Sequence, residues 1–205
     1  MTPAQRRSQL LWIFENELLF QTRHALHAIE PIKGSLFSDN EVKDLEGFWF
    51  SMNSALNAIA SIANVLWPSQ DRKHSGPTAV QSSSRDRAKI MRENLGLSDD
   101  SIVALRGVRN GLAHYDERVD RWFVQSGNRI FLDLCVSGND GVSAEPDTTY
   151  ARHFNTDTKV LSVFGISLNV EAVLQEIIEL NRVVESSIFK PRPGLIRRTV
   201  IEGNQ

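Results

Sequence analysis

The first thirty residues repeat apolar side chains at intervals of three and four positions, and this pattern constrains the fold more than any other. The repeating positions are Leu11, Phe14, Leu18, Ala25 and Ile29. Charged residues lie between them, so the spacing predicts an amphipathic α-helix over residues about 4–30. Pro31 and Gly34 then end this helix. The chain therefore begins with the kind of long element from which helical bundles are built.

A second long helix is predicted from its start and stop signals. Ser38 or Asp39 can cap its N-terminus, because their side-chain oxygens accept hydrogen bonds from the first backbone N–H groups. The helix runs to Trp67 and stops at Pro68, which disfavours helical geometry in the residue before it. Its later part is rich in small side chains, which would let another helix approach closely.

Three more helices complete the predicted helical part. Residues 69–84 contain Gly, Pro and several serines, which is typical of a polar loop. A short helix over residues about 85–95 follows and is closed by Gly96. The next helix begins near residue 99, behind a cap and first-turn acids, and ends between residues 113 and 120. A last helix runs from a cap at Asn169 to about Phe189.

Between the last two helices the pattern changes from helical to strand-like. Residues 121–124 and 129–136 flank Ser126-Gly127-Asn128, which predicts a β-hairpin. Residues 159–164 are a candidate for a third strand.

The predicted fold is mainly α: a helical bundle with a small β-hairpin or sheet insertion before the last helix. The insertion spans residues about 121–165. With 205 residues the chain is long enough to bury a core, and residues 1–189 are expected to form one domain. Residues 190–205 contain two prolines, two adjacent arginines and a polar end, so we expect a loose C-terminal tail.

Composition narrows the class of protein. Hydrophobic residues make up 41% and charged residues 23%, as in soluble globular proteins, and the net charge of −2 gives no overall basic footprint for nucleic acid. Any RNA site must therefore be a local patch. Cys135 is the single cysteine, so no disulfide forms within the chain and cysteine-rich zinc sites are excluded. These features fit a reducing cytoplasm, which is the location that we expect.

No stretch reaches the roughly 18 uncharged apolar residues that a membrane span needs. Two arginines precede an apolar run near the N-terminus, as in a signal peptide. However, Glu15 and Glu17 interrupt that run and no small-residue cleavage site follows it. We interpret this segment as an amphipathic helix and expect no membrane partner.

Candidate catalytic side chains are concentrated in Arg109-Asn110-Gly111-Leu112-Ala113-His114, near the end of a predicted helix. Histidine both takes and gives protons near neutral pH, because its unperturbed pKa lies there. Arginine keeps its positive charge and presents a fork of donors that suits phosphate. An arginine, an asparagine and a histidine this close together are a minimal set for cleaving a phosphodiester without a metal.

A helical projection separates this motif from the predicted core. At about 100° per residue, one side carries the apolar residues Ile102, Leu105, Val108, Leu112 and Val119. The opposite side carries Val103, Gly107, Asn110, His114, Glu117 and Arg121. Asn110 and His114 are four residues apart and can touch. Arg109 lies about 140° from His114, so both reach one atom only if the arginine stem curves round or the helix deforms at Gly111.

Each of these residues also has a structural interpretation. His114 is alternatively a surface or capping histidine, and Arg109 an ion-pair partner of an acid such as Asp100. Gly107 and Gly111 lower helix stability, which indicates close approach by a partner helix or by a substrate backbone. Alternatively, the helix simply ends or kinks near Gly111.

Arg109, Asn110 and His114 resemble the Arg-Asn-x-x-x-His signature of the HEPN superfamily, small helical domains that include many bacterial ribonucleases and toxins. The resemblance implies an up-and-down bundle of about four or five helices. It also implies a homodimer in which two copies of the motif meet in one composite active site. The activity that it implies is metal-independent endoribonuclease, with ribose 2′-hydroxyl attack leaving a 2′,3′-cyclic phosphate and a 5′-hydroxyl.

The resemblance also assigns roles and partners. His114 is the general base or acid, Arg109 stabilises the charge that develops on phosphorus, and Asn110 orients His114 or binds a phosphate oxygen. RNA is the substrate, and neither a cofactor nor a metal is required. The expected setting is the toxin of a toxin–antitoxin pair, with a cognate antitoxin protein as partner, or a phage-defence effector.

Four residues directly after the motif extend the candidate site toward RNA binding. Tyr115 can stack on RNA or hydrogen-bond to it, or is a half-buried aromatic of the bundle. Asp116 can pair with an arginine of the motif or cap a neighbouring helix. Arg118 and Arg121 can hold RNA phosphates, or are surface charges.

Two further functions stay open. The first is a non-catalytic HEPN-like module that binds nucleotide or RNA or acts through protein partners. The second is an unrelated helical bundle in which the motif occurs by accident. A symmetric dimer with His114 facing a cleft favours the nuclease, whereas a buried His114 bonded to backbone favours a structural role.

Overall fold

The computed structural model describes most of the chain. The described residues are 1–37, 42–68, 78–101, 103, 111–112, 114–125, 130–138 and 148–190. Arg109 and Asn110 lie outside these ranges, as do Ile102, Leu105 and Val108 of the predicted apolar stripe. Of the predicted C-terminal tail, residues 190–205, all but Lys190 lie outside them as well.

The first helix, α1 (Pro3–Ile29), confirms the opening pattern. The Thr2 side chain accepts a hydrogen bond from the Gln5 backbone N–H, and the Gln5 side chain accepts one from the Thr2 N–H, which caps two free donors. A 3₁₀ turn (Glu30–Ile32) and the short helix α2 (Lys33–Phe37) follow. Helix α1 ends before Pro31 as predicted, but Gly34 lies inside α2 and is not itself the stop.

The second long helix, α3 (Leu45–Leu66), begins later than predicted. Its cap is Asp44, whose carboxylate accepts a 2.8 Å hydrogen bond from the Gly47 N–H. The predicted caps, Ser38 and Asp39, lie outside the described residues, and residues 42–44 are not helical. The stop before Pro68 is confirmed, because α3 ends at Leu66.

Helix α4 (Thr78–Leu95) begins inside the segment predicted as a loop. The serine-rich composition disfavours helix, but Ala88, Met91 and Leu95 are buried, and tertiary packing of such a stripe outweighs weak local preference. Gly96 has φ +68° and closes the helix as predicted.

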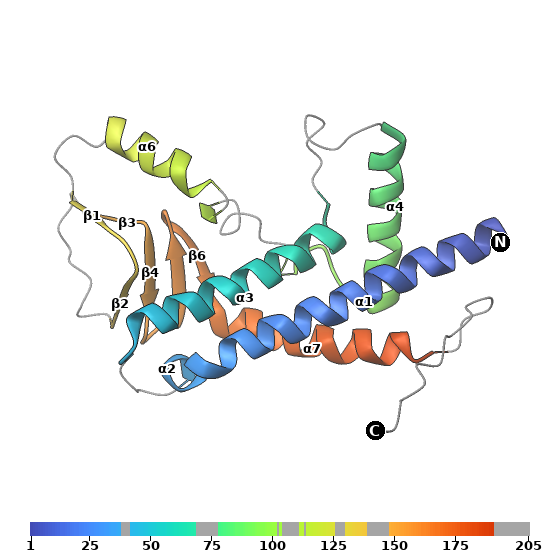
Figure 1. Cartoon of the computed structure of the whole chain (residues 1–205), viewed down its shortest axis with the longest axis horizontal. Helices are drawn as coiled ribbons and strands as arrows, with labels where there is room; N and C mark the ends of the chain where they lie inside the picture. Colours follow the sequence, from blue (N-terminus) through green and yellow to red (C-terminus); the bar gives the residue numbers. More distant parts are fainter. Residues whose placement is uncertain are drawn as a thin grey trace, which may run out of the picture.

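The last helix, α7 (Val170–Ile188), matches its prediction closely. The Asn169 side chain accepts a 2.8 Å hydrogen bond from the Ala172 N–H at its start. Its buried stripe includes Val173, Ile177 and Val184. Helices α1, α3 and α7 run side by side, with α1 packed against both others, and α4 crosses them at one end (Figure 1).

A small β region, made of a two-stranded and a four-stranded sheet, lies at the opposite end of these helices from the N-terminus (Figure 1). Its first ladder pairs β1 (Ile130–Leu132) in parallel with β3 (Thr148–Tyr150). Its second ladder pairs β2 (Cys135–Ser137) in parallel with β4 (Arg152–Asn155). Two antiparallel neighbours extend this second ladder, first β5 (Val160–Val163) and then β6 (Ile166–Asn169).

The sheet shares one core with the helices. Phe154, Leu161 and Val163 are fully buried on one face. The ring of Phe154 lies 5.3 Å from that of Phe48 on α3, which joins the two parts. The chain is therefore mainly helical with a small sheet before the last helix.

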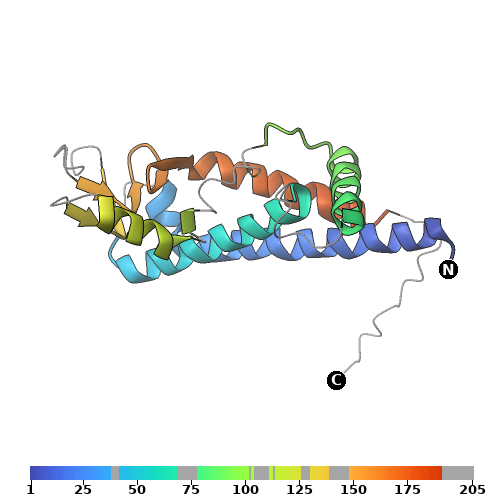
Figure 2. The ribbon, with the colours of Figure 1, turned by 90° about the horizontal axis from the view of Figure 1, so that it is seen from above.

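The prediction of a β-hairpin over residues 121–136 is wrong. Residues 121–124 belong to helix α6 (Tyr115–Gln125), so the β insertion begins at Ile130 and not near residue 121. Seen from above, α6 lies against the sheet end of the molecule (Figure 2). Strands β1 and β2 pair with strands much later in the chain, which local sequence patterns do not reveal. Residues 159–164 are confirmed as a strand, β5, whereas β3, β4 and β6 were not predicted.

Within the described residues, no helix is both long enough and apolar enough to cross a membrane.

Candidate functional site

His114 occupies a turn immediately before α6. Its backbone carbonyl accepts a 3.1 Å hydrogen bond from the Arg118 N–H, which attaches the turn to the first turn of the helix. The imidazole is 56% exposed, and its Nδ1 lies 3.3 Å from Oε1 of Glu117. The ring is therefore reachable from solvent, in contrast to the buried histidine that a structural role would favour.

The helix around His114 differs from the predicted one. Gly111 and Leu112 are helical, His114 is in a turn, and α6 continues to Gln125, beyond the predicted end. Val103 is only 2% exposed, so its predicted place on the polar side is wrong. Leu112 packs against the core, as its predicted stripe requires.

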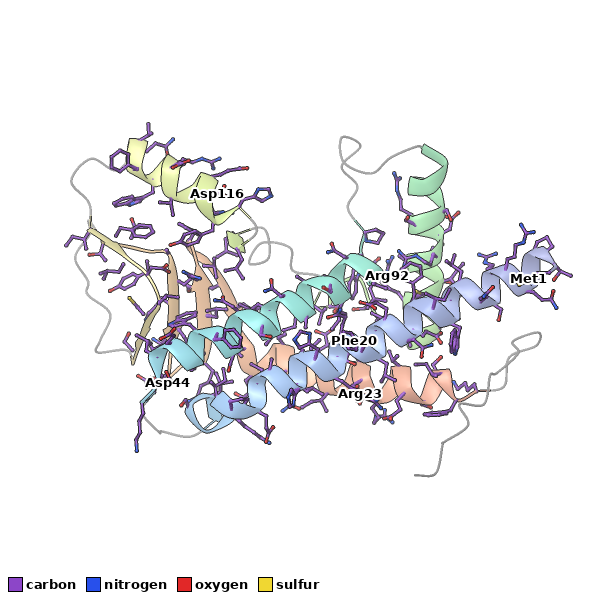
Figure 3. The ribbon with its side chains drawn as sticks, viewed as in Figure 1. Met1, Phe20, Arg23, Asp44, Arg92 and Asp116 are labelled. Atoms are coloured by element: carbon purple, nitrogen blue, oxygen red, sulfur yellow. The ribbon has the colours of Figure 1, made fainter. Side chains whose placement is uncertain are left out.

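One face of α6 rests on the sheet and the other faces solvent. Tyr115, Arg118, Val119 and Trp122 are partly buried, while Asp116 and Arg121 are exposed. Asp116 is labelled at the start of α6 in Figure 3. Since no described residue of α6 is fully buried, this helix is held mainly by contacts of its sheet-facing side chains.

Tyr115 is the first of these contacts, and it joins two residues that sequence patterns did not single out. Its hydroxyl donates a 2.7 Å hydrogen bond to Oδ2 of Asp133. Arg152 donates to the same carboxylate through Nε, at 2.8 Å, and Nη2, at 2.5 Å. The guanidinium carbon of Arg152 also lies 4.8 Å from the centre of the Tyr115 ring. Tyr115 is therefore both a half-buried aromatic and a hydrogen-bond donor.

Tyr115, Asp133 and Arg152 form a cluster in which the groups shift one another's pKa values. Burial alone would raise the pKa of the Asp133 carboxyl, but the hydrogen bonds from Arg152 and Tyr115 lower it further than burial raises it, so this pKa lies below its ordinary value. The hydrogen bond to Asp133 raises the pKa of Arg152. Burial and the Asp133 hydrogen bond raise the pKa of Tyr115. Near neutral pH the cluster is thus a carboxylate held by a cation and a neutral phenol.

Asp133 lies between β1 and β2, where the chain bends. The next residue, Leu134, has φ +55°, an unfavourable conformation for a branched side chain. Its N–H donates to Oδ1 of Asp133 at 2.9 Å, and its carbonyl accepts a 2.8 Å hydrogen bond from the buried indole of Trp49 on α3. These two bonds hold the bend that separates the β1–β3 ladder from the β2–β4 ladder.

Aromatic rings continue the contact between α6 and the sheet. The Trp122 ring lies 4.7 Å from that of Phe131, and the Tyr115 ring lies 5.6 Å from that of Phe164. The guanidinium of Arg118 sits 5.5 Å above the Phe164 ring. Arg118 therefore packs on an aromatic ring, a contact that the sequence-based predictions, an RNA-phosphate ligand or a surface charge, did not include.

Two other histidines, His153 and His24, have local side-chain partners. His153 is 8% exposed, and its Nε2 lies 2.8 Å from the Ser137 hydroxyl. Burial lowers the pKa of His153, as expected for an imidazole that packs in neutral form. His24 lies 3.1 Å from the Ser54 hydroxyl. Among the described residues no group of three or more histidine, cysteine or acidic side chains could hold a metal ion.

Gly111 is approached by a side chain of the same molecule. A Cβ placed on it would lie 2.9 Å from Cγ1 of the buried Val163 on β5. The close approach predicted from the glycine is therefore accounted for by the sheet.

We expect Gly111→Ala to lower the free energy of unfolding by about 1–3 kcal/mol, because the added methyl group forces the fully buried Val163 side chain to shift. Urea unfolding measures this change. In a Val163→Ala background the cost of Gly111→Ala should be smaller, since the colliding methyl groups are gone. An equal cost in both backgrounds would contradict the proposed contact.

Compared with protein-family models, with curated proteins and with solved structures, the chain gives no significant match.

Proposed function

We propose that this chain is a metal-independent endoribonuclease with a HEPN-like, up-and-down helical bundle. The observation that carries the proposal is the exposed imidazole of His114, in a turn fixed to the start of α6. A general acid or base must be reachable by its substrate and held in place by its backbone. Both conditions are met by His114, the histidine of the Arg-Asn-x-x-x-His motif.

The proposed reaction needs one base, one acid and a cation. His114 takes the proton of the ribose 2′-hydroxyl, and the 2′-oxygen forms a bond to phosphorus. The bond from phosphorus to the 5′-oxygen breaks, and this oxygen receives a proton from the acid, His114 of the partner subunit in a composite site. Arg109 stabilises the charge that develops on phosphorus, and Asn110 orients His114 or binds a phosphate oxygen.

Two arginines of α6 support an RNA path that starts at His114. His114, Arg118 and Arg121 follow one another at intervals of four and three residues, which places them along the same side of the helix. Arg121 is exposed, while Arg118 is partly buried above Phe164. We propose that Arg118 and Arg121 on this side of α6 hold backbone phosphates. The proposed setting is a cytoplasmic toxin with a cognate antitoxin, or a phage-defence effector.

A second candidate function is a non-catalytic HEPN-like module that binds nucleotide, RNA or another protein. The exposed apolar end of α6 favours a protein partner. Phe123 is 77% exposed, Val124 is 81% exposed, and Ile130 at the start of β1 is 46% exposed. Neighbouring exposed apolar side chains such as Phe123 and Val124 are typical of interaction sites.

The deciding experiment is cleavage of end-labelled RNA by the purified chain in EDTA. We expect fragments that end in a 2′,3′-cyclic phosphate, and no cleavage where the attacked nucleotide carries 2′-deoxyribose. Arg109→Ala should abolish cleavage while the protein stays folded. A folded wild-type chain that cuts no RNA across a varied set of sequences and structures would overturn the ribonuclease proposal and favour the binding module.

A further inference from the structure

Helix α6 is anchored by a specific polar contact at the end that carries His114. None of its described residues is fully buried, and partly buried side chains such as Trp122, which packs on Phe131, hold the helix on the sheet. At its first residue, however, Tyr115 reaches the Asp133 carboxylate at 2.7 Å. The turn of His114 directly precedes this anchored residue, so the position of the turn depends on it.

We propose that Asp133 and Arg152 are positioning residues, which hold Tyr115 and thereby fix the His114 turn relative to the sheet. Neither residue belongs to the motif: Asp133 lies between β1 and β2, Arg152 lies on β4, and both follow the motif in the chain. The consequence for catalysis rests on the proposed ribonuclease function. The consequence for the position of the turn does not.

The hydrogen bonds of Asp133 make it a rigid attachment point. Its two carboxylate oxygens accept from Tyr115, from two nitrogens of Arg152 and from the Leu134 N–H. A two-pronged arginine–carboxylate contact fixes direction as well as distance. Both side chains are about four-fifths buried, with exposed fractions of 18% for Arg152 and 20% for Asp133, so water competes weakly for these bonds.

The attachment point is itself tied to the helical core. The strained Leu134 beside Asp133 is held by the Trp49 indole, and Trp49 is 2% exposed. Strain of this kind persists only where the surrounding structure fixes it, and it occurs often at functional sites. A chain of contacts thus runs from α3 through Trp49, Leu134 and Asp133 to Tyr115, next to His114.

Two conservative variants test this inference. Tyr115→Phe removes one hydroxyl, and Arg152→Lys keeps the charge but loses the two-pronged geometry. The matched control is Arg182→Lys, because Arg182 makes the same two-pronged contact with Glu179 on the exposed side of α7. Amide hydrogen exchange is measured over α6 and α7 in each protein, together with kcat and KM for RNA cleavage.

We expect faster exchange in α6 and unchanged exchange in α7 for Tyr115→Phe and Arg152→Lys, with wild-type behaviour for Arg182→Lys. The kcat should fall by about 10- to 100-fold with little change in KM, because a misplaced catalytic group slows chemistry more than binding. Unchanged exchange in α6, or a loss confined to KM, would overturn the inference. A wild-type chain that cuts no RNA would overturn the ribonuclease proposal alone, since the exchange measurement still decides whether the contact holds the turn.

Discussion

Replacing His114 with alanine is expected to lower kcat for RNA cleavage by about 10²- to 10⁴-fold, which is the usual contribution of a general acid or base. The free energy of unfolding should change by less than about 0.5 kcal/mol, because substitutions on an exposed surface rarely cost more. The side chain is 56% exposed and its contact, with Glu117, is exposed as well. Initial rates in EDTA and urea unfolding of the same preparations measure both effects.

His27→Ala is the matched control for this substitution. His27 is exposed on α1, in a different part of the molecule from α6, so its removal should leave both kcat and stability unchanged. Equal loss of activity in both variants would indicate a general effect on the preparation. Full activity of His114→Ala would show that the cleavage comes from another residue or from a contaminant.

Replacing Asp133 with asparagine is expected to lower the free energy of unfolding by about 2–3 kcal/mol at neutral pH, as for a lost hydrogen bond to a charged group. The amide cannot accept both arms of Arg152, and its NH₂ group would face the guanidinium. Arg152, 18% exposed, would then keep a largely buried charge without its carboxylate. Urea unfolding at pH 7 measures this loss.

The same substitution predicts a dependence on pH. The pKa of Asp133 in the folded chain lies below its ordinary value of 3.8, so folding favours the carboxylate. Its stabilising contribution is complete above pH about 3.8, the unfolded value, and is lost as pH falls through the folded value. The difference between wild type and Asp133→Asn should therefore shrink toward zero in acid. Glu179→Gln is the control, because an ion pair exposed to water contributes little to the free energy of unfolding. If the stability difference between wild type and Asp133→Asn stays constant down to pH 2.5, the lowered pKa assigned to Asp133 is contradicted.

Local signals predicted much of the helical part correctly. The apolar spacing of α1, the stop at Pro68, the glycine at the end of α4 and the Asn169 cap all involve residues within a few positions of one another. Such signals act through backbone geometry and hydrogen bonds inside one element. They therefore survive in the sequence without knowledge of the rest of the fold.

The errors in the β region fell where two distant segments meet. Residues 121–124 have strand-forming side chains, but Trp122 packs on Phe131 and the segment is helical. Strands β1 and β2 need parallel partners from β3 and β4, and parallel pairing always joins segments that are far apart in the chain. A short apolar run alone does not identify its partner or even its type of structure.

For the candidate site, the sequence by itself determined the motif with His114, the neighbouring Tyr115 and the helical character of the chain. The tertiary structure alone decided that the His114 ring is exposed, that Val163 fills the space beside Gly111, and that Asp133 and Arg152 hold Tyr115. The physical reason is distance along the chain. Asp133 is 18 residues from Tyr115 and 19 from Arg152, so their contact exists only once the sheet register and the docking of α6 are fixed.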